Sequence, residues 1–230
     1  MTEVEQIKKL LEACTVDQRR EIFKYLRGEF RIHPIESQLN AEAELILEAI
    51  ARSSDLTQRG IRGVIAEAAF ETYVVNKLQG WDKLPLEGNS PYDFLLKDAR
   101  GQVRVQVKMQ RLKDHRPMMA NQAYKWLPSD KYVVETQRTR GGVDKTTGEG
   151  TRPYRFGEFD VLAVSAHPST NDWTSFIYTV ANWLLPRQED KRLMLKFQPV
   201  APTPSDMWTD SYETCVKWFR SGKKKKIFAQ

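Results

Sequence analysis

The segment Ser90–Arg111, SPYDFLLKDARGQVRVQVKMQR, decides the fold because it predicts two strands joined by a short turn. Residues 92–96 form an apolar run that a single acid, Asp93, interrupts, and residues 97–101 are polar. Three valines then alternate with three polar residues: Val103, Val105 and Val107 with Arg104, Gln106 and Lys108. A period of two is typical of a strand with one apolar face, so the segment predicts a β-hairpin.

The polar residues of this hairpin predict a metal-dependent active site. Side chains two residues apart share a strand face, so Gln106 and Lys108 project together, and pairing of the two halves brings Asp93 near them. Asp93, the Gln106 side chain and the Val107 carbonyl offer oxygen ligands to a hard divalent cation. Lys108 is suited to orient or deprotonate an attacking water, or to neutralise charge on a phosphate.

The hairpin resembles the active-site hairpin of the PD-(D/E)xK nuclease superfamily, specifically that of its type II restriction endonucleases. Pro91-Tyr92-Asp93 corresponds to the first part of the pattern, with one extra residue, and Gln106-Val107-Lys108 corresponds to the acid-x-Lys triplet. The usual acid is Gln here, as in some restriction enzymes, which removes one charge from the metal site. The resemblance implies Mg²⁺ as cofactor and an α/β fold, restriction-endonuclease-like, with a central mixed sheet flanked by helices and the active hairpin at one edge.

A helix predicted over Thr57–Leu78 adds a further acid. It is apolar almost all round, which predicts burial, yet Glu67 and Glu71 lie one turn apart on a single stripe. Buried carboxylates are costly unless they are paired or bound to metal. In the superfamily a helix ahead of the hairpin often supplies an acid to the metal site, and this resemblance favours Glu67 over Glu71. Pairing of the carboxylate with a core Arg or Lys is the alternative.

Composition excludes several other classes of protein. The 230 residues are 40% hydrophobic and 29% charged, enough for one large globular domain, residues 1–230, with residues 1–55 as a helical N-terminal layer. Two scattered cysteines and three scattered histidines match no zinc or disulfide pattern. The sequence contains no apolar run of about 18 residues, so no membrane span is predicted. It also contains no signal-peptide core, so we expect a cytoplasmic protein.

Charge predicts a polyanionic partner, which we expect to be double-stranded DNA. Residues 100–157 hold thirteen Lys or Arg and five Asp or Glu, a local charge of +8, whereas the whole chain carries +6. A long loop, Gln137–Arg155, is rich in glycine and arginine, and long loops in compact domains are usually functional. The predicted DNA-binding residues are Arg111, Lys113, Arg138, Arg140, Lys145, Arg152 and Arg155.

Short motifs predict the remaining elements. Thr2 and Thr15 begin capping boxes, and Asn40 is predicted to cap a third helix; apolar faces on these helices predict packing. Phe156–Ser165 predicts a buried strand, and it resembles the strand that follows the catalytic strand in many restriction enzymes. The segment Phe197–Ser205 holds three prolines and predicts a connector, and Trp208–Phe219 predicts a helix.

These observations predict a Mg²⁺-dependent endonuclease that cuts duplex DNA at a specific, palindromic sequence. A two-fold dimer is the simplest device for cutting both strands of a symmetric site. The family resemblance also implies a cognate DNA methyltransferase as partner. Two alternatives are a repair or junction-resolving nuclease on the same scaffold, and a non-catalytic basic DNA-binding protein in which Gln106 marks a lost acid.

Overall fold

The computed structural model describes residues 2–30, 33–88, 90–138 and 152–227. The chain divides into two compact units, Met1–Gln58 and Arg59–Gln230, which are described in turn. Across the described residues, every helix is too short or too polar to cross a bilayer.

The first unit consists of helices, of which the first two begin where the capping signals predict. They are α1 (Glu3–Ala13), α2 (Val16–Glu29), α3 (Ile35–Leu39) and α4 (Ala43–Arg52). Thr2 and Thr15 both form the predicted capping boxes, with each hydroxyl accepting a backbone N–H three residues ahead. Asn40 was wrongly predicted to begin a helix, because it ends α3 in the left-handed conformation (φ 48°), which asparagine tolerates.

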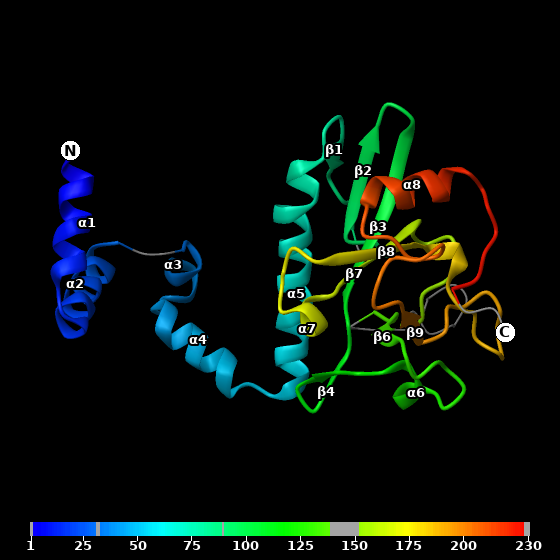
Figure 1. The fold of residues 1–230 in the computed structure, drawn as a ribbon, viewed down its shortest axis with the longest axis horizontal. Helices are drawn as coiled ribbons and strands as arrows, with labels where there is room; N and C mark the ends of the chain where they lie inside the picture. Colours follow the sequence, from blue (N-terminus) through cyan, green and yellow to red (C-terminus); the bar gives the residue numbers. More distant parts are fainter. Residues whose placement is uncertain (1, 31–32, 89, 139–151, 228–230) are drawn as a thin grey trace. The chain divides into compact units, whose positions relative to one another are not determined.

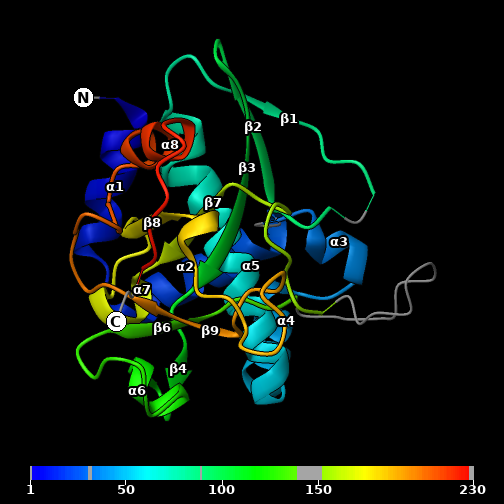
Figure 2. The same cartoon turned by 90° about the vertical axis from the view of Figure 1, so that its right-hand side faces the viewer.

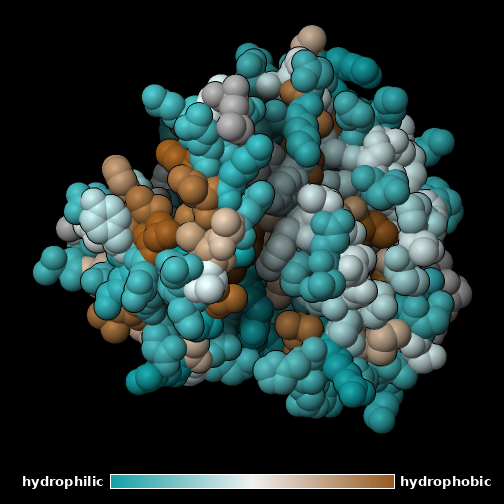
Figure 3. Space-filling view, turned by 60° about the vertical axis from the view of Figure 1, so that its left-hand side comes forward, coloured by the Kyte–Doolittle hydropathy of each residue, from teal (hydrophilic) through white to brown (hydrophobic). Residues whose placement is uncertain are grey.

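The apolar faces of this unit remain at the surface. None of α1, α2 and α4 contains a buried residue, and Leu10 and Phe23 are 68% and 56% exposed. Figure 3 shows hydrophobic side chains, coloured brown, on the face of the molecule that it presents. The buried side chain in the described part of the unit is polar: Glu36 accepts from Arg27 at 3.1 Å and from the backbone of Ala43 at 2.9 Å. The predicted packing is therefore only partial: Leu11, Ile22 and Ile46 are partly buried, but helices this few and short enclose little volume.

The second unit is built on a five-stranded mixed sheet, which confirms the predicted fold class (Figures 1 and 2). Its strands, in spatial order, are β1 (Asp82–Leu84), β2 (Phe94–Asp98), β3 (Gly101–Met109), β7 (Val161–Ser165) and β8 (Phe176–Val180). β3 and β7 are parallel, and the other neighbours are antiparallel. The predicted hairpin is formed by β2 and β3, with Phe94 opposite Val105.

The hairpin lies inside the sheet rather than at its edge, contrary to the prediction. β1 covers the outer side of β2, and β7 pairs with β3, so β3 is the middle strand. β1 is only three residues long, with the sequence Asp-Lys-Leu, and shows no alternation that could reveal it. The central position explains the near-complete burial of Val103, Val105 and Val107.

Helices α5 (Asp55–Tyr73) and α8 (Tyr212–Arg220) flank this sheet. Phe70 of α5 is fully buried, and its ring lies 5.2 Å from that of Phe94 and 6.3 Å from that of Tyr212. The predicted burial of α5 on all sides is wrong, because Val64 is 62% exposed. One face of α5 therefore packs on the sheet, and the residues facing the sheet are candidates for the site.

Smaller elements complete the unit. They are two 3-10 turns (Val75–Lys77 and Ala181–Trp183), β4 (Leu112–Lys113), β5 (Arg116–Pro117), α6 (Ala120–Ala123), β6 (Tyr132–Glu135), α7 (His167–Thr170) and β9 (Phe197–Val200). β9 corrects the expectation of a connector, because Pro199 lies opposite Val133 in a two-stranded sheet with β6. Proline is tolerated there, where a strand has a free side that needs no N–H donor.

Candidate active site

Asp93 is held against the middle strand by the hairpin itself. Its backbone N–H donates to the carbonyl of Val105 at 2.9 Å, and its carboxylate oxygen Oδ2 accepts from the backbone N–H of Val107 at 2.8 Å. The same oxygen accepts from Nε2 of Gln106. Asp93, Gln106 and Val107 therefore meet at one point, as strand pairing predicts.

Glu67 reaches the same site from α5, one turn before the buried Phe70. The pKa of Glu67 is raised to about 7, chiefly by burial and further by the negative charge of Asp93, while the positive charge of Lys108 opposes the shift. These couplings indicate that the Glu67 carboxyl group lies within range of the charges of Asp93 and Lys108. Glu71, the alternative, instead forms an ion pair with Lys83 of β1. The structure thus brings Glu67 to the hairpin and directs Glu71 to the outer strand.

The site holds two carboxyl groups whose ionisation is disfavoured. Burial also raises the pKa of Asp93, and this effect exceeds the opposing effects of the Lys108 charge and of the Val107 and Gln106 hydrogen bonds. A divalent cation between the two carboxylates would remove both penalties, because opposite charge favours the ionised form.

The residues present fit Mg²⁺. Within the described ranges, no group of three or more His, Cys, Asp or Glu side chains forms a metal cage. Mg²⁺ does not require one, since it commonly binds through one or two carboxylates, waters and substrate phosphates. Asp93 and Glu67 would be the carboxylate ligands, and the Gln106 side chain and Val107 carbonyl are neutral oxygen donors on the same strand. Gln106 is 1% exposed, so its amide is held in this position.

Lys108 lies on the same strand face and contacts a residue that the sequence did not single out. Its ammonium nitrogen lies 5.6 Å from the ring centre of Tyr154, which is 3% exposed. Burial raises the pKa of the Tyr154 hydroxyl; among the smaller effects, Lys108 lowers this pKa by its charge and by hydrogen bonding, and Asp93 raises it. Tyr154 thus belongs electrostatically to the site, although 46 positions in the sequence separate it from Lys108.

The predicted DNA-binding residues fall into several settings. Arg138 is partly buried in an ion pair with Glu158 at 2.9 Å, and its guanidinium lies 5.7 Å from the Tyr154 ring centre. Arg152 is exposed, and its carbonyl accepts from the Arg138 backbone N–H at 3.0 Å. Arg155 donates its backbone N–H to Glu158 at 2.9 Å. The predicted residues Arg140 and Lys145 lie outside the described residues.

Two further predicted residues follow the middle strand directly. Arg111 lies 3.7 Å from Glu135 in an ion pair, and Lys113 is exposed in β4. β4 and β5 form a hairpin whose turn residues Asp114 and His115 have φ values of 50° and 59°. This left-handed pair is the geometry that matches strand twist in a two-residue turn. The exposed tip of this hairpin is therefore connected to Lys108 by only a few residues.

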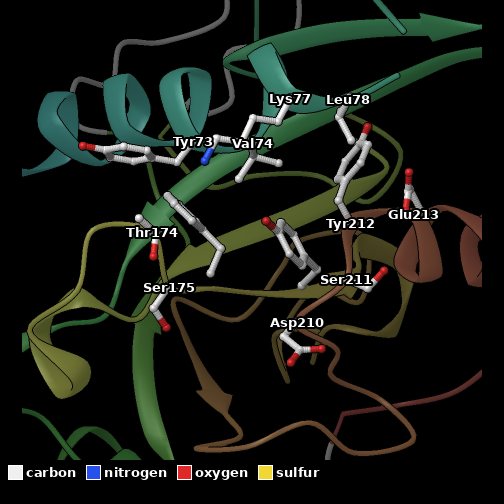
Figure 4. Close-up of a pocket in the computed structure, with 12 residues that line it drawn as sticks. Tyr73, Val74, Lys77, Leu78, Thr174, Ser175, Asp210, Ser211, Tyr212 and Glu213 are labelled. Carbon is white, nitrogen blue, oxygen red and sulfur yellow. The ribbon is translucent and has the colours of Figure 1, made fainter. Parts of the chain in front are cut away.

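A cavity of about 430 Å³ lies apart from these groups, between the end of α5, β8 and the start of α8 (Figure 4). Tyr73 and Lys77 line one side, and Asp210 and Glu213 line the other. None of Glu67, Asp93, Gln106 and Lys108 lines it. The carboxylate site therefore lies outside this cavity.

Comparisons with known proteins add little. No protein-family model matches the sequence, and no curated protein matches it. One solved structure that aligns with the chain is that of a bacterial homing endonuclease, I-Ssp6803I, with 18% sequence identity and a TM-score of 0.37. The alignment covers 71% of this chain and 94% of that one. Because this TM-score is low, the likeness supports no conclusion about activity, and the site is described by its own contacts.

Proposed function

We propose that this protein is a Mg²⁺-dependent endonuclease that hydrolyses phosphodiester bonds in double-stranded DNA. The observation that carries the proposal is the convergence of Glu67, Asp93, Gln106 and Lys108 from a helix and two strands. Two carboxylates, a neutral amide and a lysine at one point match the needs of phosphoryl transfer, which are charge neutralisation and the positioning of a water.

Each residue has a distinct role in this proposal. Asp93 and Glu67 hold the cation, Gln106 completes its oxygen ligands or positions the water, and Val107 offers its carbonyl. A bound Mg²⁺ would stabilise the negative charge that develops on the phosphate. The Lys108 ammonium orients the attacking water and neutralises charge on the phosphate. The water oxygen forms a new bond to phosphorus and releases its proton to solvent, while the bond to the leaving sugar oxygen breaks and that oxygen takes up a proton from solvent.

We further propose that the enzyme is of the type II restriction class, cuts a palindromic sequence as a homodimer and acts beside a cognate methyltransferase. The local charge of +8 over residues 100–157 supports a DNA partner. The exposed Lys113 in the β4–β5 hairpin and Arg138 near Tyr154 are the proposed contacts with the duplex.

The deciding experiment is digestion of a mixed-sequence plasmid with and without Mg²⁺, with Lys108→Ala as the control. Discrete bands that need both Mg²⁺ and Lys108 support site-specific cleavage. Cleavage of branched DNA alone would contradict site-specific cleavage and would indicate a junction-resolving nuclease. Uncut DNA that the protein still shifts on a gel would indicate a non-catalytic binding protein.

A further inference from the structure

The contact between Lys108 and Tyr154 has no counterpart in the hairpin pattern. Lysine carries a flexible four-carbon stem, and ordering it costs up to about 2 kcal/mol of rotamer freedom. A lysine that must direct a water toward a phosphate therefore gains from a fixed partner that holds its ammonium in place. Tyr154 is adjacent to that ammonium, and its own position is fixed.

Several contacts hold Tyr154. Its ring meets that of Phe159 edge to face, with centroids 5.3 Å apart at 85°. Its carbonyl accepts from the backbone N–H of Met194 at 2.8 Å. On the ring lies the guanidinium of Arg138, which Glu158 anchors. With 3% exposure, the ring has no room to turn into solvent.

The chemistry of a phenol suits this role better than that of a carboxylate. Burial keeps the hydroxyl neutral, so it can accept a hydrogen bond from an ammonium without neutralising its charge. A carboxylate at this point would form an ion pair with Lys108 and draw it away from Asp93 and Glu67. A neutral acceptor leaves the full positive charge for the reacting phosphate.

We propose that Tyr154 is a positioning residue that holds the ammonium of Lys108 at the carboxylate site through its hydroxyl, an inference that rests on the proposed nuclease function. Tyr154 acts through Lys108, without contact with the reacting atoms. The ring serves packing, whereas the hydroxyl serves Lys108, so the two roles can be separated by removing one oxygen atom.

The test compares Tyr154→Phe with Tyr212→Phe. Both tyrosines are buried, but the Tyr212 hydroxyl has no hydrogen-bond partner in the described structure, so its loss controls for removal of a buried hydroxyl. Under single-turnover conditions with Mg²⁺, Tyr154→Phe is expected to cut about tenfold more slowly or worse, since the proposed hydrogen bond from the Lys108 ammonium to the hydroxyl is lost. Its affinity for the duplex, measured with Ca²⁺, stays within about twofold of the wild type because the charges are unchanged.

A second readout does not depend on cleavage. In protein labelled with ¹³C at the tyrosine ζ carbon, Lys108→Met is expected to shift the resonance of Tyr154 and to leave that of Tyr212 unmoved. Cutting at the wild-type rate by Tyr154→Phe would overturn the positioning role alone. An unmoved Tyr154 resonance would refute the contact, and a wild-type protein that cuts no DNA would remove the proposed function and this role with it.

Discussion

Glu67→Gln is expected to stabilise the metal-free protein at pH 8. The folded protein raises the pKa of Glu67 from 4.5 to about 7, so it binds a proton that the unfolded chain has already released. The associated stability is fully present below about pH 4.5 and is lost as the pH rises through about 7. Glutamine has no proton to lose, so the variant does not show this decline.

The magnitude follows from the pKa difference. One pKa unit corresponds to about 1.4 kcal/mol, so the shift sets an upper bound of about 3 kcal/mol. Glu67 is partly exposed, and solvent screening reduces the expected gain at pH 8 to about 1–2 kcal/mol. At pH 5 the variant and the wild type are expected to differ by much less.

Urea denaturation in EDTA at pH 5, 6.5 and 8 measures this difference. Glu71→Gln is the matched control: it removes the partner of Lys83, a pair that is about 40% exposed, and is expected to cost about 0–1 kcal/mol rather than to stabilise. Adding Mg²⁺ at pH 8 should stabilise the wild type, by about 1.4 kcal/mol at ten times Kd, and Glu67→Gln by less. Equal losses of stability by wild type and Glu67→Gln between pH 5 and pH 8 would refute the raised pKa of Glu67.

Three further predictions address catalysis, stability and DNA binding. Lys108→Ala should reduce the cleavage rate more than tenfold. The affinity for the duplex in Ca²⁺ should stay nearly intact, because Lys108 is one positive charge among many for binding. A residual cleavage rate above a tenth of the wild-type rate would contradict the role of Lys108. Asp160→Ala should lower the free energy of unfolding in urea by about 1.5–3 kcal/mol, because the nearly buried carboxylate accepts charge-assisted hydrogen bonds from Arg104, one of them at 2.7 Å. An effect under about 1 kcal/mol would show the pair to be dispensable. Arg152→Ala should weaken binding to cognate and scrambled duplexes equally and lower the salt slope by about one, while a loss confined to the cognate duplex would reveal base contact.

Much of the fold could be read from local patterns. The alternation in residues 103–108 is set by which side chains face the core, and a strand keeps that alternation whatever lies beside it. The capping boxes at Thr2 and Thr15 are equally local, since each needs only residues three apart. Asp93 joins Gln106 and Val107 because a hairpin brings sequence neighbours together.

Long-range placement could not be read in the same way. β3 became the middle strand because β7, more than fifty residues later, pairs with it in parallel, and β1 was too short to show a pattern. Asn40 was misassigned because the same side chain that begins a helix also tolerates the left-handed conformation that ends one.

The sequence alone determined the hairpin and the chemical types of its polar residues, because a period of two and a tight turn are properties of adjacent residues. Only the tertiary structure distinguishes the surroundings of Glu67 and Glu71, which lie one helical turn apart: Glu67 is coupled to the charges of Asp93 and Lys108, whereas Glu71 pairs with Lys83. The tertiary structure also brings Tyr154 next to Lys108. The two residues are far apart in the sequence, so no local pattern predicts this contact. The packing of distant elements sets the charge and burial around each carboxylate, and these determine its pKa and its capacity to hold a cation.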